Sequence, residues 1–311
     1  MNDKKDSQPA SDVAANHHPG NHDPESITTE RSLERESEDQ HYIPVIVKRT
    51  DQSIRHPDDT LQQSINEGLE QLHRHTVSLT LSSVAAGMIL GFTAMVVGVV
   101  ASGMADVDQP TLVRLATALV YPLGFIICII SGTQLFTEHT ATAVYPVLDR
   151  KAPFRSLLRL WIIVLIGNLI GAAFIAGLLT FADNIIQAKA GYIIVAHHLV
   201  SPATLDLIIS GTLAGWLMAL GGWLIMSTQA TLSQIVCIYI VTFLIGMGGL
   251  HHSIAGSVEM FTAYFISDQF SLQQTARFIG LAVLGNLIGG SIFVAILNYG
   301  HIRKTQELEE H

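Results

Sequence analysis

The chain has little charge outside its first quarter. Charged residues make up 14% of its 311 residues, against about 25% in a typical soluble domain. Fifteen of the 26 acidic residues precede position 73, together with seven of the 17 basic residues, so the remainder is close to neutral. An acidic arm followed by an apolar body does not fit a nucleic-acid-binding protein.

Cysteine is scarce, and an amino-terminal apolar segment is lacking. Cys128 and Cys237 both lie inside apolar runs, where we expect buried hydrophobic side chains rather than a disulfide or metal ligands. The first forty residues are hydrophilic. We therefore expect no cleaved signal peptide and an uncleaved first membrane helix that directs insertion.

The chain divides into a polar arm and an apolar body. Residues 1–57 have too few apolar side chains to offset their ordering entropy, which predicts a disordered, acidic cytoplasmic tail. Residues 58–75 are predicted to form an amphipathic helix on the membrane surface. Its apolar residues recur at spacings of three and four: Leu61, Ile65, Leu69 and Leu72. Residues 76–304 form the predicted membrane domain, and 305–311 a polar tail.

Long runs without Asp, Glu, Lys or Arg indicate an all-α membrane protein. They cover residues 75–105, 115–137, 160–182, 207–258 and 278–302. Since a span needs about 20 apolar residues, the fourth run must hold two spans with a turn near 227–231. This gives six predicted spans, centred near residues 90, 130, 170, 215, 248 and 290.

Basic residues in the short loops predict the orientation. Seven lie on the side of the chain ends: Arg74, Arg150, Lys151, Arg155, Arg159, Arg303 and Lys304. Three lie on the other side: Arg114, Lys189 and Arg277. Because cytoplasmic loops are enriched in Lys and Arg, we expect both ends in the cytoplasm and a cell inner (cytoplasmic) membrane location.

Glycine pairs indicate an internal repeat. Four spans carry two glycines separated by three residues: Gly87/Gly91, Gly167/Gly171, Gly211/Gly215 and Gly285/Gly289. The string Gly-Asn-Leu-Ile-Gly occurs at 167–171 and at 285–289. A unit of three spans and about 120 residues inserts in opposite orientations, which predicts an inverted 3+3 repeat. Asn168 and Asn286 in these strings need buried partners, either a neighbouring backbone or a break in the adjacent helix.

The second and fifth spans are predicted to be broken. Each apolar region, 112–147 and 232–267, would make a straight helix of about 54 Å, against a hydrocarbon core of about 30 Å. Both have polar centres, at 131–140 and 246–253. Non-helical backbone at membrane depth is tolerated only against protein or a water-filled cavity, so these centres predict the transport site.

The strings at these two centres resemble the formate/nitrite transporter family, over about residues 70–304. The first is Leu135-Phe136-Thr137, and the second is His251-His252-Ser253-Ile254-Ala255. Within the family, Gln134 to Glu138 and Gly256 to Glu259 resemble the YfdC-like branch. The resemblance implies an aquaporin-like fold and a homopentamer with one pore per subunit.

The resemblance also implies the pore residues. His252 would be the central histidine, followed by Ser253, with Thr137 as its partner on the opposite loop. Leu135 and Phe125 would form the cytoplasmic constriction, and Tyr121 and Ile245 the periplasmic one. The sequence departs from the family pattern at Gln134 and His251, where acidic residues are usual, and at Ile245, where an aromatic residue is common.

Together these features predict a channel for small monovalent anions of weak acids, of the formate or nitrite type. His252 would donate a hydrogen bond or a proton, because its unperturbed pKa of about 6.5 lies near neutral pH. Glu138 and Glu259 follow the two centres and would either bond neighbouring polar groups or tune the histidine. We expect no cofactor, no metal site and no enzymatic activity.

Three alternatives stay open at this point. A channel for a small neutral solute would share the fold, although the paired Asn-Pro-Ala strings of aquaporins are absent from the sequence. An intramembrane metalloenzyme would need a His-x-x-x-His or His-Glu-x-x-His spacing, which no predicted span carries. A membrane sensor would use the acidic tail to recruit a partner.

Overall fold

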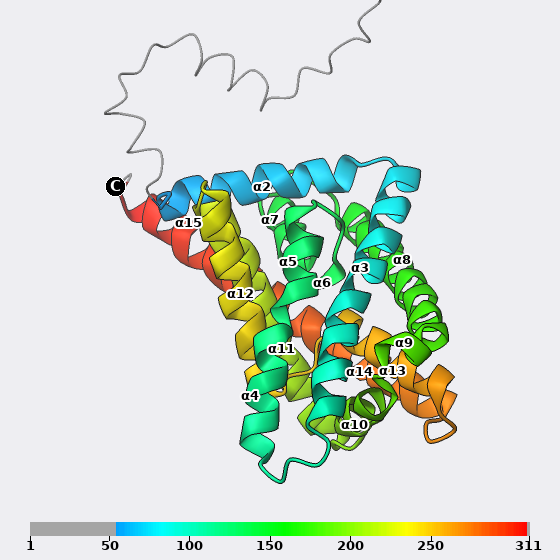
Figure 1. Ribbon diagram of the computed structural model, residues 1–311. Coiled ribbons are helices and arrows are strands. Elements are labelled where there is room, and N and C mark those ends of the chain that lie inside the picture. The colour runs from blue at the N-terminus through cyan, green and yellow to red at the C-terminus, as the bar shows by residue number, and fades with distance from the viewer. Residues whose placement is uncertain (1–53, 310–311) are drawn as a thin grey trace, which may run out of the picture. The chain divides into compact units, whose positions relative to one another are not determined.

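Helices make up all the regular structure in residues 54–309, the part of the chain that the structure, a computed structural model, describes (Figure 1). In chain order they are α2 (Pro57–His73), α3 (Thr76–Gly103), α4 (Pro110–Val120), α5 (Pro122–Ile130), α6 (Phe136–Thr142), α7 (Tyr145–Leu148), α8 (Phe154–Phe181), α9 (Asp183–Ile186), α10 (Lys189–Val200), α11 (Thr204–Ser227), α12 (Thr231–Gly248), α13 (Ser253–Ile266), α14 (Leu272–Ile288), a π-helix (Gly289–Ile296) and α15 (Leu297–Glu309). All but the last four residues of the predicted tail 1–57 lie outside the described residues.

Six helical stretches in the described residues are long and apolar enough to cross a membrane, which confirms the predicted class. They are Thr76–Gly103, Pro110–Ile130, Phe154–Phe181, Thr204–Ser227, Thr231–Gly248 and Leu272–Lys304. The second and fifth are centred about ten residues earlier than predicted, because α5 ends just before its polar string and α12 ends within its own, so the residues that follow are not part of these stretches.

Two helix pairs pack at glycines. Gly87 of α3 lies against the backbone of Asn168 on α8, and Gly215 of α11 lies against the backbone of Asn286 on α14. A Cβ atom at either glycine would overlap the partner's carbonyl oxygen. The backbones of both helix pairs therefore approach closely at these glycines.

The outward face of α8 is apolar. Ile162, Ile166, Ile170 and Phe174 recur every fourth residue and are all about half exposed. Such a continuous apolar stripe needs lipid or another subunit to cover it.

Helix α2 covers one end of the helices, and α10 lies at the opposite end (Figure 1). Leu61, Ile65 and Leu72 on α2 are buried, because α2 packs against α6, α7, α8 and α11. Its apolar face is therefore occupied by protein and is not free to insert into lipid, unlike the surface helix expected from the sequence. Between α8 and α11 the chain forms two short helices, α9 and α10.

A polar cluster joins the end of α15 to the segment after α7. Arg303 donates to Asp149 Oδ1 at 2.6 Å, Tyr299 donates to the same oxygen at 3.0 Å, and Lys151 lies 3.0 Å from Asp149 Oδ2. Partial burial raises the pKa of Asp149, but the hydrogen bonds from these three side chains outweigh it and hold the pKa below its usual value.

This cluster gives a pH-dependent prediction. Because the folded-state pKa is depressed, the stabilisation by Asp149 is present above its unfolded pKa of about 3.9 and is lost as the pH falls through the folded value. We expect Asp149→Asn to lower the stability of the detergent-solubilised protein by about 1–2 kcal/mol at pH 7. The gap in melting temperature should close towards pH 3. A constant gap, or an equal effect of the exposed-site control Asp106→Asn, would contradict the assignment.

Candidate functional site

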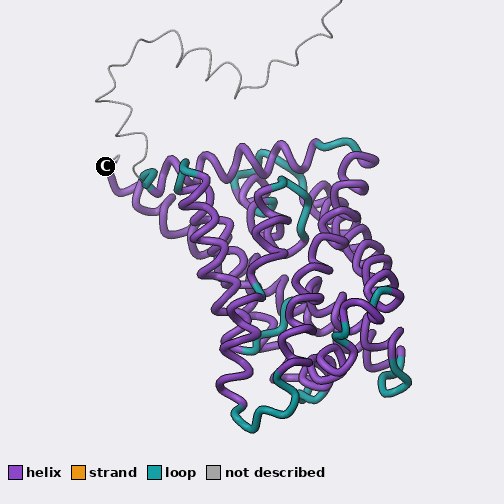
Figure 2. The backbone as a smooth tube through the Cα atoms, viewed as in Figure 1, coloured by secondary structure: helices purple, strands orange, loops and turns teal. Residues whose placement is uncertain are grey.

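Two short non-helical segments interrupt the chain inside the bundle (Figure 2). Residues 131–135 separate α5 from α6, and residues 249–252 separate α12 from α13. Gly132 and Gly249 have φ angles of 68° and 60°, a left-handed conformation that glycine adopts without strain. These glycines allow α5 and α12 to end where they do.

A buried amide on a neighbouring helix holds the first interruption. Asn168 Oδ1 accepts the Phe136 N–H at 2.8 Å, and its Nδ2 donates to the carbonyl oxygens of Gln134, at 2.8 Å, and Ser83, at 2.7 Å. The Gln134 N–H donates to Ser82 Oγ at 3.1 Å. These bonds pair backbone groups that the interrupted helix leaves without helical partners.

The second interruption is held in the same way by Asn286. Its Oδ1 accepts the Ser253 N–H at 2.8 Å, and its Nδ2 donates to the carbonyl oxygens of His251, at 3.0 Å, and Gly211, at 2.8 Å. The His251 N–H donates to Ser210 Oγ at 3.2 Å. In each set the amide bridges the residues on both sides of one central position, which is Leu135 in the first and His252 in the second.

His252 joins the two interruptions. Its Nε2 lies 2.6 Å from Thr137 Oγ1, and its Nδ1 accepts the Ala255 N–H at 3.2 Å, which caps α13. Since Nδ1 is an acceptor, the neutral ring carries its proton on Nε2 and donates it to Thr137. The Phe125 ring meets the imidazole edge-on, with centroids 4.9 Å apart.

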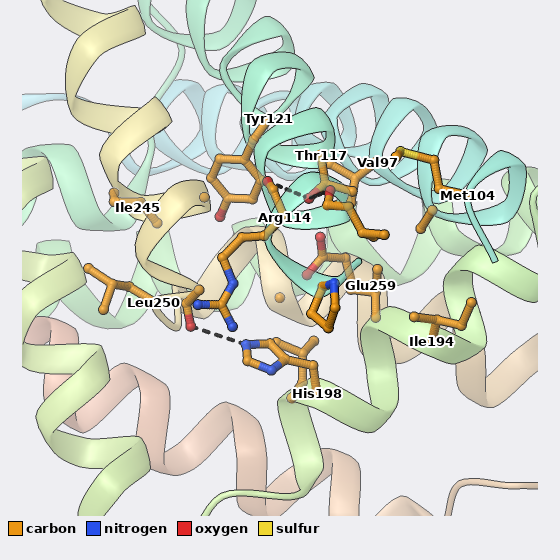
Figure 3. A pocket seen from close by; sticks show the side chains of 18 of the residues that line it. Val97, Met104, Arg114, Thr117, Tyr121, Ile194, His198, Ile245, Leu250 and Glu259 are labelled. Carbon is orange, nitrogen blue, oxygen red and sulfur yellow. Dashed lines mark hydrogen bonds between the residues drawn. The ribbon is translucent and has the colours of Figure 1, made fainter. Parts of the chain in front are cut away.

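A cavity of about 480 Å³ lies beside His252, between α3, α4, α10, α12 and α13. Tyr121, Ile245, His252 and Glu259 line it, together with Arg114 and His198. Figure 3 shows the Arg114 guanidinium and the Glu259 carboxylate pointing into the same space. The cavity thus combines apolar walls with a guanidinium and a carboxyl group.

The other candidate residues lie around this cavity without lining it. Phe125 is buried between Tyr121 and His252, with its ring 5.1 Å from that of Tyr121. Leu135, Phe136 and Ser253 are buried.

Gln134 and His251 occupy matching places beside the two interruptions. Both are buried, and the Oε1 of Gln134 and the Nε2 of His251 have no hydrogen-bond partner among the described residues. Ser210 Oγ lies 2.7 Å from His251 Nδ1, and the His251 ring stacks on that of His198.

The two candidate glutamates differ in their surroundings. Glu259 lines the cavity, whereas Glu138 is absent from the cavity lining and lies 3.9 Å from His139 Nδ1. No motif in the sequence marks Arg114 or His198 as part of a site. No group of three or more potential metal ligands occurs in residues 54–309.

Comparisons with known proteins identify the family to which the chain is similar. A family model described as "Formate/nitrite transporter" matches residues 58–300. "Inner membrane protein YfdC" of Escherichia coli (strain K12) is 28% identical over 240 residues, which cover 76% of each chain.

Two solved structures share the fold at 20% identity. "FNT family ion channel" has a TM-score of 0.70 and covers 78% of this chain and 99% of its own. "Pentameric formate channel with formate bound" has a TM-score of 0.60 and covers 72% and 96%.

The amide bridges generate a stability prediction. Asn168→Ala removes the partner of the Phe136 N–H and of the Gln134 carbonyl, and Asn286→Ala removes the partner of the Ser253 N–H and of the His251 carbonyl. We expect each substitution to cost about 2–4 kcal/mol, measured as lower melting temperatures in detergent. Thr180→Ala is the matched control, because its hydroxyl bonds only within its own helix. Equal melting temperatures for all three variants would refute the bridging role.

Proposed function

Because the chain belongs to the formate/nitrite transporter family, we propose that it is a channel for small monovalent anions of weak acids, such as formate and nitrite. It is a multi-pass membrane protein, and its relatives carry the names of channels and transporters rather than enzymes. The single observation that carries the proposal is His252, which faces the cavity and donates a hydrogen bond across to the other interruption.

We interpret the two interruptions as breaks in the second and fifth membrane helices of an inverted 3+3 repeat, in an aquaporin-like arrangement. The matching hydrogen bonds of Asn168 and Asn286 support this proposal, as do the matching glycine contacts of Gly87 and Gly215. Non-helical backbone beside a cavity is where transporters place their substrate sites.

In the proposed passage, the anion enters the cavity and replaces Thr137 as the acceptor of the His252 Nε2–H. Tyr121 and Ile245 narrow the path on the cavity side of the histidine, and Phe125 and Leu135 on the other. A bare anion is costly in such apolar surroundings. The substrate therefore crosses these narrow parts as a hydrogen-bonded or neutral acid, which favours weak acids over chloride.

We further propose a homopentamer in the cell inner membrane, with both chain ends in the cytoplasm. The solved relative named as a pentameric formate channel supports the assembly, and the excess of Lys and Arg on the side of the chain ends supports the orientation. The exposed apolar stripe of α8 would then face lipid or a neighbouring subunit.

Flux through proteoliposomes tests the function. The wild-type protein should take up labelled formate or nitrite, and glycerol no faster than protein-free vesicles do. His252→Ala removes the donor and should lower formate uptake by about tenfold or more, because a hydrogen bond to a charged group contributes about 1.5–3 kcal/mol. Thr137→Val should have a smaller effect.

The matched control is His197→Ala, which removes an exposed histidine that does not line the cavity. It should leave formate uptake unchanged. If His252→Ala keeps the uptake and the pH dependence of the wild type, His252 does not have the role assigned to it. If the wild type carries glycerol but not formate, the protein is a neutral-solute channel and not an anion channel.

A further inference from the structure

We propose that Glu259 is the proton-exchanging residue of this channel, which protonates a weak-acid anion in the cavity beside His252. The inference rests on the proposed function and deepens it, because it assigns the donation of the proton to Glu259 and not to His252. The class of substrate is a small carboxylic acid or another weak oxyacid.

The position of Glu259 is the first observation. His252, Gly256 and Glu259 all line the cavity, and their spacing of four and three residues puts them on one face of α13. Glu259 is only 5% exposed, yet no hydrogen bond or ion pair joins its carboxylate to another residue in the described part of the chain. A buried carboxylate that neither caps a helix nor pairs with a cation is free to act on whatever enters the cavity.

The engagement of His252 is the second observation. Its Nδ1 accepts the Ala255 N–H, and its Nε2 donates to Thr137. The ring cannot take up a proton at Nδ1 without giving up the cap of α13. His252 is therefore placed to donate a hydrogen bond, and the proton that neutralises the substrate anion must come from another group.

The other ionisable groups around Glu259 are unsuited to this exchange. Arg114 carries a guanidinium, which has only donors, and Tyr121 a phenol, so neither side chain is a carboxylic acid. His198 is exposed, and its Nε2 lies 3.1 Å from the Gly249 carbonyl oxygen. The remaining neighbours of α13 add little, because α3 and residues 160–181 of α8 carry no ionisable side chain other than neutral hydroxyls.

The other ionisable groups on elements packed against α13, which include Lys189 and Tyr192 of α10, do not line the cavity. Arg277 on α14 donates to the carbonyl oxygens of Val200 and Pro202, and His197 on α10 bonds Gln269. Glu138 and His139 on α6 lie near each other and do not line the cavity. Glu259 is thus the carboxyl group that a substrate in the cavity meets.

The step is balanced without any further reactant. Glu259–COOH and HCOO⁻ give Glu259–COO⁻ and HCOOH, and the carboxylate then takes a proton from a hydronium ion of the water outside, which leaves a water molecule. Because donor and acceptor are both carboxylic acids, the transfer is close to thermoneutral in water. Arg114 supplies the positive charge that draws the anion into the same space, and the neutral acid continues past Phe125.

The test is formate uptake by proteoliposomes of the full-length protein with a pH indicator inside. Formate and protons are counted together between pH 5 and 8, and protein-free vesicles are subtracted. The wild type should move one proton with each formate. Glu259→Gln keeps the shape but carries no exchangeable acid, so formate uptake should fall by about tenfold or more and its remaining rate should lose the wild-type pH profile.

Asp268→Asn is the matched control, since Asp268 is an exposed carboxylate just after α13, and it should retain the wild-type ratio and pH profile. Glu259→Asp should keep one proton per formate at a lower rate. An unchanged proton ratio and pH profile in Glu259→Gln, with formate uptake intact, would overturn the inference alone. Absence of formate and nitrite uptake in the wild type would overturn the proposed function, and the inference with it.

A second measurement covers the case in which Glu259→Gln does not insert. Dicyclohexylcarbodiimide is an apolar reagent that modifies protonated carboxyl groups within membranes. It should label Glu259 of the wild-type protein, as read by peptide mass spectrometry. The fraction of proton-coupled formate uptake that is lost should equal the fraction of Glu259 that is labelled. Labelling of Glu259 with uptake unchanged, or no labelling of Glu259 at any pH tested, would count against the proposal.

Discussion

The structure depends on how buried backbone groups are satisfied where helices stop inside an apolar bundle. Each N–H or C=O group left without a partner in such surroundings costs several kcal/mol. Asn168 and Asn286 meet this constraint, since each uses one oxygen and one nitrogen to bridge the two sides of an interruption. The glycines at Gly87 and Gly215 bring the supporting helices close enough for the amides to reach. The glycines that allow close packing therefore lie directly against the asparagines that bond the interruptions.

Much of this arrangement could be predicted from the sequence, because it depends on the residue types within each segment. Charge-free runs gave six spans, and the family resemblance rested on strings that lie at the interruptions. The repeated Gly-Asn-Leu-Ile-Gly string pointed to both asparagines, although the two readings of their role proved to be one: the neighbouring backbone that each amide bonds is the interrupted segment itself.

What the sequence could not provide is the set of contacts made between distant elements. Nothing local shows that Arg114 and His198 share a cavity with Glu259, because they come from three helices. The apolar face of α2 has the pattern of a surface helix, yet α6, α7 and α11 cover it. The π-helix at Gly289–Ile296 interrupts a string that reads as ordinary helix. At these places the local sequence pattern fits more than one structure, and it does not contain the contacts with distant elements that the folded protein makes.

The two central positions show how one scaffold holds different chemistry. Leu135 and His252 each lie between two residues whose backbone groups bond the side-chain amide of an asparagine. Within the interruptions, these bridges involve backbone atoms only. The amide bridges therefore do not depend on the side chain at the centre, and an apolar residue stands at one centre while the imidazole at the other also caps α13. The cavity lies on the imidazole side, where α13 also presents Glu259. In the proposed passage, a solute meets the hydrogen-bonding groups first and the buried Leu135 afterwards, an order that suits a solute losing its charge on the way.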